Sequence, residues 1–258
     1  MDRGPQPEWA CPSVGFHVRD TVDEETATMR ITAVIEPPMT AVGRISGASV
    51  PGGVGGRCRS VASVRQVAEL ERTARVDVLV EGYVRMPHVA GTVSLVRDAD
   101  RVVIVDPGMV ADRDLILRPL AELGVRPEDV TDVVVSHHHL DHTLNVALFP
   151  VVPVHDFQSV IEGHTFIRRP ADGVQLSPSI RLLATPGHTP QDITTLVGTP
   201  DDVMALTHLW WTEQGPADDP YCTDRELLRQ QRERVLDVAT LIVCAHGPAF
   251  RPNGSTPR

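Results

Sequence analysis

Seven consecutive residues near the middle of the chain, Ser136–His142, read Ser-His-His-His-Leu-Asp-His and combine four histidines with one aspartate. The β-branched run Val133–Ser136 predicts a buried strand, so the histidines follow where that strand ends. His137 and His139 are two positions apart, and in an extended chain their imidazoles point in the same direction. These two side chains can therefore bind one metal ion together.

The end of the same segment offers a second group of ligands. Asp141 and His142 lie where the chain already turns, and their oxygen and nitrogen atoms can hold a second ion, whereas His138 points away from the first pair. Imidazole and carboxylate ligands without thiolate favour zinc, with manganese or iron as substitutes. Histidine runs also occur in tags and low-complexity tracts, but this run is internal and follows a strong strand.

Two later histidines stand beside glycine. His188 occurs in Thr-Pro-Gly-His-Thr, and His246 occurs in Ala-His-Gly-Pro. They supply the further ligands that four-coordinate zinc needs. The sequence therefore predicts one or two zinc ions per chain.

This pattern resembles the metallo-beta-lactamase superfamily, and the resemblance covers residues 76–252. The segment His137–His142 matches the His-x-His-x-Asp-His signature, and Asp106, after the apolar run Val-Val-Ile-Val, resembles the first motif. His188 and His246 resemble the third and last motifs. The resemblance implies an α/β fold, the four-layer αββα sandwich, with the metals at the shared edge of two sheets. Asp106 is then expected to fix the metal loop or a ligand imidazole through hydrogen bonds.

His208 departs from the superfamily pattern, which places an aspartate that bridges both metals at this strand end. A neutral imidazole does not bridge two zinc ions, so the repulsion between the two dications is less compensated. Either one ion binds tightly, with the ligands His137, His139 and His188, or His208 joins a second set with Asp141, His142 and His246. Two alternatives stay open: a buried His208 that binds no metal, or a shifted alignment in which the bridge is Asp201, Asp202, Asp218 or Asp219.

Further residues resemble one group within the superfamily, whose members are described as homodimeric endoribonucleases acting on histone pre-messenger RNA. The matching stretches are Asn145–Pro150, His155–Phe157 and His246–Phe250. The chain has no lysine among its 24 basic residues, which indicates a GC-rich bacterial genome without such transcripts. That substrate therefore does not carry over, and a phosphodiesterase or endoribonuclease activity and a homodimer are expected from the resemblance alone.

Composition limits the class of protein. With 258 residues, 41% of them hydrophobic, the chain can bury one large core. Its formal net charge of -10 disfavours long polyanions unless positive charge is concentrated locally. The four cysteines show no paired spacing and fit a reducing cytoplasm, and Cys244 is expected in the core rather than on a metal. Neither a secretory signal nor a membrane span is predicted.

The first 75 residues differ from the rest and include the glycine- and proline-rich stretch Ser46–Arg57. We expect residues 1–75 to be a disordered extension that contains a helix at Ser60–Ala74. The alternative is that the assigned start codon lies upstream of the real one, so that this segment is not translated. The hydrolase domain is expected over residues 76–252, followed by a tail at 253–258.

Short apolar runs within the domain predict strands, which include Thr92–Arg97, Val102–Asp106, Ile180–Ala184, Val203–Leu206 and Leu241–Cys244. A helix interrupted near Pro119 is expected over Ala111–Leu123. A capping box of Thr223 and Glu226 predicts the start of the last helix. The stretch Gln158–Ser179 is expected to be a long loop.

The predicted function is hydrolysis by metal-bound hydroxide. A metal held by three imidazoles with an open position lowers the pKa of bound water to about 7. Asp141 can orient this hydroxide as well as bind the second ion, so it is the candidate catalytic residue.

The substrate is less constrained, and either a small molecule or a short nucleic acid is expected. Arg168 and Arg169 can clamp a phosphate, unless they belong to a solvated loop. Trp210 and Trp211 can form an apolar pocket wall, unless they pack in the core. Thioester or ester hydrolysis of the glyoxalase II kind is the alternative to phosphodiester hydrolysis. A further alternative is a scaffold that lost catalysis at His208.

Overall fold

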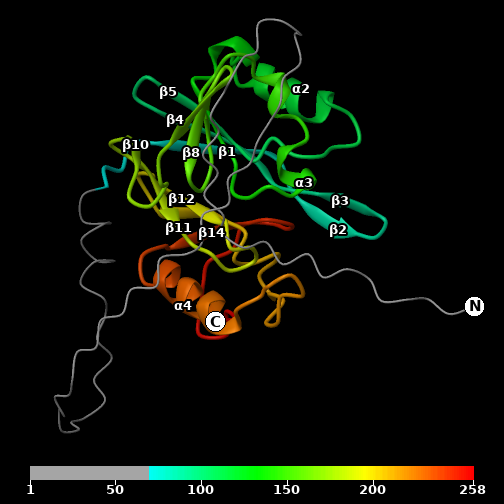
Figure 1. The fold of residues 1–258 in the computed structure, drawn as a ribbon, viewed down its shortest axis with the longest axis vertical. Coiled ribbons are helices and arrows are strands. Elements are labelled where there is room, and N and C mark those ends of the chain that lie inside the picture. Colours follow the sequence, from blue (N-terminus) through cyan, green and yellow to red (C-terminus); the bar gives the residue numbers. More distant parts are fainter. Residues whose placement is uncertain (1–69) are drawn as a thin grey trace, which may run out of the picture. The chain divides into compact units, whose positions relative to one another are not determined.

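The computed structural model of the protein describes residues 70–258 and contains two large β-sheets (Figure 1). The seven-stranded sheet has the order β1 (Arg75–Val80), β4 (Val93–Asp98), β5 (Arg101–Val105), β6 (Asp132–Val134), β7 (Val154–His155), β8 (Ser159–Glu162) and β9 (Thr165–Arg168). The five-stranded sheet has the order β10 (Gln175–Ser177), β11 (Ile180–Ala184), β12 (Ile193–Gly198), β13 (Val203–Thr207) and β14 (Leu241–Cys244). A separate hairpin is formed by β2 (Tyr83–Arg85) and β3 (His88–Ala90).

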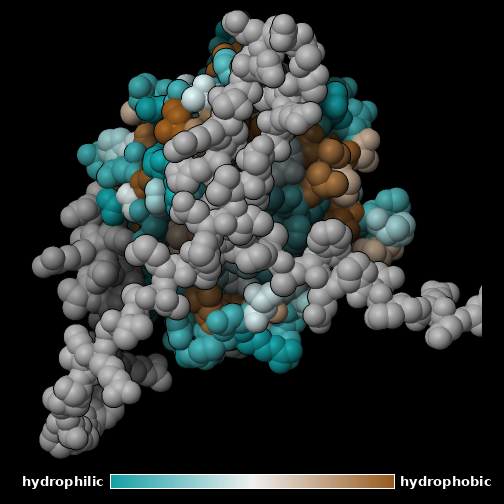
Figure 2. All heavy atoms as spheres, in the orientation of Figure 1, coloured by the Kyte–Doolittle hydropathy of each residue, from teal (hydrophilic) through white to brown (hydrophobic). Residues whose placement is uncertain are grey.

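The two sheets pack face to face, and a helix covers the outer face of each. Because successive side chains of a strand point to opposite faces, Val103 and Val105 of β5 join the core between the sheets, whereas Ile104 packs with helix α2 (Asp114–Glu122). In the second sheet, Leu182 faces the inner core and Leu183 packs with helix α4 (Arg225–Leu236). Figure 1 shows α2 and α4 on opposite sides of the sheets, and Figure 2 shows hydrophilic side chains over α4. This arrangement confirms the predicted αββα sandwich.

Two pairs of parallel strands bring distant segments to one edge of the sandwich. Strand β5 is parallel to β6 in the first sheet, and β13 is parallel to β14 in the second. Parallel neighbours end at the same edge of a sheet, so the residues that follow these four strands are brought together. Those residues include Asp106 after β5, the histidine loop after β6, His208 after β13 and His246 after β14.

The folded domain extends beyond both predicted limits. The helix expected over Ser60–Ala74 lies mostly outside the described residues, and its last five residues are not helical. The amide of Glu71 donates to Pro178 and that of Ala74 to Gly198, which fastens residues 70–74 to the second sheet. At the other end, the carbonyl of Pro257 accepts a hydrogen bond from the indole of Trp210. Residues 70–75 and the tail at 253–258 therefore belong to the packed unit.

The stretch Gln158–Ser179 is not a long loop, because it contains β8, β9 and β10. Every residue of β9 is exposed, so this edge strand lacks the apolar alternation that marks a strand in a sequence. Helix α4 is capped by Asp224, whose side chain accepts from the amide of Leu227, rather than by Thr223. After the histidine loop, the short helix α3 (Leu140–Thr143) is followed by the 3-10 turn η2 (Val146–Leu148).

Within the described residues, no helix combines the length and hydropathy that a membrane crossing requires. The two cysteines in this part of the chain are free thiols. Cys244 is buried, and its sulfur contacts the carbonyls of Gly247 and Pro248 at 3.4 Å. It therefore serves as a core residue, as predicted.

Candidate metal centre

The histidine loop is held in place by Asp106. This residue adopts a positive φ of 54° directly after β5, a conformation that aspartate tolerates better than most residues. One carboxylate oxygen accepts from the amide of Ser136 at 2.6 Å, and the other lies 3.0 Å from Nδ1 of His142. Asp106 therefore fixes both the loop and one ligand imidazole.

Two glycines allow the loop to pack closely. A Cβ atom on Gly108 would lie 1.7 Å from the carbonyl oxygen of Asp141, and one on Gly91 would lie 2.8 Å from the His142 ring. The backbone of these glycines thus forms the surface against which α3 rests. A side chain at either position would displace the ligands that α3 carries.

The first group of candidate ligands contains His137, His139 and His188, whose ligand atoms lie within 4.8 Å of one another. Nδ1 of His139 lies 2.9 Å from Nε2 of His137 and 3.2 Å from Nε2 of His188. His137 and His188 are buried, whereas His139 is half-buried and faces the pocket. The third ligand comes from the loop between β11 and β12.

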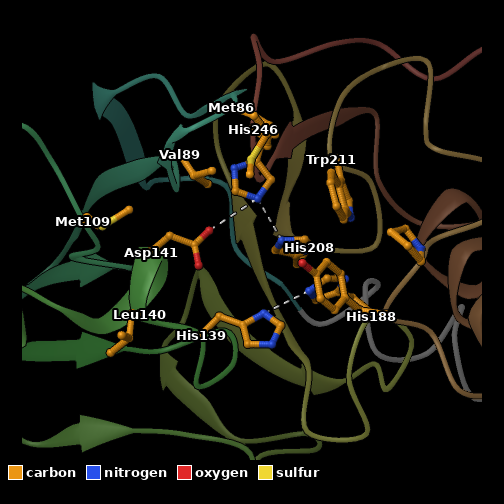
Figure 3. Close-up of a pocket in the computed structure, with 13 residues that line it drawn as sticks. Met86, Val89, Met109, His139, Leu140, Asp141, His188, His208, Trp211 and His246 are labelled. Carbon is orange, nitrogen blue, oxygen red and sulfur yellow. Dashed lines mark hydrogen bonds and ion pairs between the residues drawn. The ribbon is translucent and has the colours of Figure 1, made fainter. Parts of the chain in front are cut away.

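The second group contains Asp141, His142 and His246. Oδ2 of Asp141 lies 3.4 Å from Nε2 of His142 and 3.6 Å from Nε2 of His246. His208 stands next to this group, with its Nε2 3.1 Å from Nε2 of His246. Figure 3 shows the side chains of His139 and Asp141, which share one segment, pointing toward those of His188, His208 and His246 from three other segments.

The donor atoms fit a metal ion. Ligands at 2.0–2.1 Å from a tetrahedral zinc ion are separated from one another by about 3.3–3.4 Å. The observed separations between donors span 2.9 Å to 3.6 Å. Nε2 of His142 and Nδ1 of His208 are buried and make no hydrogen bond to any described residue. A buried polar atom without a partner is costly, so these nitrogens indicate a place for an ion or water.

Carboxylates and a backbone carbonyl accept hydrogen bonds from Nδ1 of three of the histidine ligands, which is the ring nitrogen that faces away from the metal position. Nδ1 of His188 lies 2.8 Å from Oδ2 of Asp219, and Nδ1 of His246 lies 3.0 Å from the carbonyl of Ala90. These acceptors, together with Asp106 behind His142, keep Nδ1 protonated and leave Nε2 free to bind metal. Asp219 is buried and also accepts from the indole nitrogen of Trp211 at 2.7 Å.

The electrostatics of the site favour neutral imidazoles at most positions. Burial, together with repulsion from neighbouring histidines, lowers the pKa of His137 and of His208 well below the usual value. Burial also lowers the pKa of His246 to about 4. His142 differs: burial opposes its charge, but Asp106 and Asp141 raise its pKa to about 9. Neutral imidazole is the form that binds metal, and at His142 the ion must displace a proton.

A pocket of about 840 Å³ opens above the ligands. Its floor includes Asp141 and four histidines, and its walls are largely apolar. The walls are formed by Val84, Met86, Val89, Met109, Leu140, Trp211, Pro220 and Tyr221. Figure 2 shows hydrophobic side chains on the side of the molecule that carries α3 and the β2–β3 hairpin.

The remaining predicted residues lie in different places. Trp211 lines the pocket, whereas Trp210 is fully buried and packs near Phe250 and Arg232. Arg168 is exposed on β9, and Arg169 lies 2.9 Å from His155; neither lines the pocket.

Three of the alternative bridging aspartates lie away from the ligands. Asp201 and Asp218 are exposed, and Asp202 pairs with Arg251. The fourth, Asp219, was predicted from the sequence only as an alternative bridge between the two metals. Its observed place behind His188 depends on the fold of the loop before α4, which no local pattern reveals.

Known proteins define the class. Residues 86–155 match the family described as the metallo-beta-lactamase superfamily. A relative from Xenopus laevis is 31% identical over 198 residues, which make up 68% of this chain and 81% of the relative. The chain belongs to the metallo-beta-lactamase superfamily, and its site is that of a metal-dependent hydrolase.

That relative is metallo-beta-lactamase domain-containing protein 1, which confirms the group indicated by the sequence. The human protein of the same name is 31% identical over 226 residues, covering 83% of this chain and 82% of that protein. Among solved structures, a metallo-beta-lactamase fold protein from Thermotoga maritima has a TM-score of 0.56 at 20% identity. It covers 70% of this chain and 100% of its own, and it supports the fold.

Proposed function

We propose that this metal-dependent hydrolase cleaves carboxylic esters or thioesters that carry an apolar acyl group. The observation that carries the proposal is the lining of the pocket. Its walls are apolar and its floor offers Asp141 and imidazoles, and among residues 70–258 no arginine contributes to it. Since the chain has no lysine, the described part of the chain gives the pocket neither a lysine nor an arginine to pair with a phosphate.

The residues of the first group would hold the ion that serves catalysis, with zinc favoured by the imidazole donors. A bound divalent ion supplies an activated water and polarises a carbonyl oxygen. Asp141 lies at the pocket floor and is half-buried, so its carboxylate can orient the attacking water and accept its proton. Asp219 engages the indole nitrogen of Trp211, which therefore presents the apolar part of its ring to the acyl group.

A phosphodiester substrate is the second candidate that the sequence suggested. The two arginines expected to clamp a phosphate lie outside the pocket, and the net charge of -10 opposes a polyanion. Endoribonuclease activity, thiol-ester specificity and a homodimer all remain predictions. A scaffold without catalysis is opposed by the first group, whose ligand atoms lie within 4.8 Å of one another.

The test compares substrates under one set of conditions. Zinc-reconstituted protein is assayed with 4-nitrophenyl esters and thioesters of short and long acyl chains, and with bis(4-nitrophenyl) phosphate. We expect kcat/KM to be higher for the esters and to rise with acyl length, by at most about fourfold per methylene. Faster hydrolysis of the phosphodiester would overturn the proposal, and no hydrolysis of any substrate would support the scaffold.

A matched pair of variants tests the pocket wall. Met86 lines the pocket and is 80% exposed, whereas Phe166 on β9 is 59% exposed and does not line it. Met86→Ser is expected to lower kcat/KM for long acyl chains several-fold and to leave short ones nearly unchanged. Phe166→Ser is the control and is expected to change neither. Equal losses with both acyl lengths would show that Met86 does not contact the acyl group.

A further inference from the structure

Arg232 of helix α4 is a fully buried cation. It is 0% exposed, and its guanidinium donates to three backbone carbonyls rather than to a carboxylate. Nε lies 2.8 Å from the oxygen of Leu209, and the two terminal nitrogens lie 2.8 Å from that of Pro216 and 3.2 Å from that of Ala217. Burial lowers the pKa of Arg232, but a guanidinium stays charged at neutral pH. Burying a charge is costly, and the hydrogen bonds to these carbonyls offset that cost.

All three carbonyls belong to the loop between β13 and α4, residues 208–224, which forms one side of the pocket. Arg232 is not among the residues that line this pocket, so it acts on the pocket only through the loop. The pocket residues that the loop provides are His208, Trp211, Pro220 and Tyr221.

The carbonyls bound by Arg232 lie on both sides of a short turn, residues 211–215, within this loop. Inside the turn, the amides of Trp211 and Thr212 donate to the carbonyl of Gly215 at 3.0 Å, and the amide of Gly215 donates back to Thr212 at 3.0 Å. The carbonyl of Leu209 precedes the turn, and the other two follow it. The guanidinium therefore joins the two ends of the turn and closes its base.

The same guanidinium also contacts one of two adjacent tryptophans. Its central carbon lies 5.6 Å from the centre of the Trp210 ring, and the indole nitrogen of Trp210 donates to the carbonyl of Pro257 at 2.9 Å. Trp210 is 0% exposed, whereas Trp211, the next residue, lines the pocket. Because Trp210 is held in the core on one side of the turn, Trp211 is held at the pocket on the other.

We propose that Arg232 is a positioning residue that shapes the acyl pocket from behind: it closes the base of the turn 211–215 and so holds Trp211 at the pocket wall, where the ring favours long acyl groups. The preference for long acyl groups rests on the proposed ester hydrolysis, whereas the closure of the turn does not. Arginine suits this role because its planar fork donates in several directions at once, whereas lysine is a point charge. The alternatives are that Arg232 only stabilises the core, or that its charge only balances that of Asp219 nearby.

Closure of the turn is measured by hydrogen exchange and mass spectrometry on the full-length protein, without substrate. Arg232→Met removes the donors and the charge, whereas Arg232→Lys keeps the charge. Val235→Ala is the control for lost core packing, because Val235 is buried on the same helix.

We expect peptides that cover residues 209–217 to exchange about ten- to hundredfold faster in both Arg232 variants, as the loss of a hydrogen bond from a charged group implies. In Val235→Ala the same peptides should exchange as in the original protein. Unchanged exchange in Arg232→Met, or slow exchange restored by Arg232→Lys, overturns the proposal. If Arg232→Met does not fold, Arg232→Lys carries the same comparison.

The effect on the pocket is measured with zinc-loaded protein and 4-nitrophenyl esters of short and long acyl chains. We expect both Arg232 variants to raise KM for the long ester several-fold and to leave kcat/KM for the acetyl ester nearly unchanged, whereas Val235→Ala should affect both esters equally. Equal losses for the two esters in the Arg232 variants would show a merely structural role and overturn the proposal. If the original protein hydrolyses no ester, the proposed function fails, and the exchange measurement still decides whether Arg232 closes the turn.

Discussion

The imidazole of His188 donates from Nδ1 to Oδ2 of Asp219 at 2.8 Å, although 31 residues separate them in the sequence. Burial opposes the negative charge of Asp219, but the hydrogen bond from His188 and others lower its pKa, so the carboxylate is ionised. The same oxygen accepts from Trp211, and the second oxygen accepts from the amide of Tyr221. One carboxylate therefore joins a metal ligand to the pocket wall.

We expect Asp219→Asn to lower both the affinity for metal and the kcat/KM for substrate. The amide is uncharged and cannot hold the imidazole and the indole as strongly, so the zinc affinity of the first site should fall about ten- to hundredfold. The affinity is measured by competition with a chromophoric chelator. Asp218→Asn is the matched control, because the neighbouring Asp218 side chain is 73% exposed. Equal affinities for the two variants would contradict this role for Asp219.

Gly108→Ala is expected to destabilise the protein and to disturb the histidine loop. The added Cβ would lie 1.7 Å from the carbonyl oxygen of Asp141, which is backbone and cannot rotate away. Overpacking of this kind costs about 1–3 kcal/mol or more. Thermal unfolding and metal content test the effect. Gly254→Ala, where no atom lies within 4 Å of the added Cβ, is the control and should behave as the original protein.

Asp98, at the end of β4, accepts hydrogen bonds from Thr73, Ser177 and Ser179 and gives the fold a dependence on pH. Burial raises its pKa, but these hydrogen bonds outweigh burial and keep the pKa below the ordinary value of 3.8. A lowered pKa in the folded state means that the stability is present above the ordinary value and is lost as the pH falls through the folded-state pKa.

Asp98→Asn is therefore expected to reduce the free energy of unfolding near neutral pH by about 2–3 kcal/mol. The difference from the original protein should shrink as the pH falls below 3.8. Urea unfolding of the metal-free proteins measures both effects, and Asp100→Asn is the control because Asp100 is exposed. A difference that stays constant down to low pH would show that the charge of Asp98 does not contribute.

Zinc is expected to stabilise the folded chain. An ion that binds only the folded state contributes about 2.7 kcal/mol at a concentration a hundredfold above its Kd. For a domain of this size that corresponds to a rise in Tm of roughly 5–10 °C. Differential scanning calorimetry with zinc, with chelator and with magnesium tests this expectation. Magnesium prefers oxygen ligands and should give no rise, whereas an identical Tm in all three samples would rule out a preformed zinc site.

The sequence predicted the parts of the site that local spacing encodes. His137, His139, Asp141 and His142 lie in one short segment after a strand, and the fold brings them together with His188 and His246. The position of His208 at the end of β13 was also visible in the sequence, but its stacking on His188 depends on how two loops pack.

Other features were not predicted from the sequence, because they depend on contacts between residues that are distant in the chain. Trp210 and Trp211 are adjacent and look alike in the sequence, yet one is buried in the core and the other lines the pocket. Strand β9 lacks an apolar alternation, because both of its faces are exposed. The cap of α4 fell one residue later than predicted, since Asp224 competes with Thr223 for the same role.

The most direct test of the metal centre is a crystal structure of the zinc-loaded protein, with anomalous difference maps measured above and below the zinc edge. The structure predicts two peaks in each chain, one beside His137, His139 and His188 and the other beside Asp141, His142 and His246. A map without a peak among these side chains, or with the zinc bound elsewhere, would contradict the account.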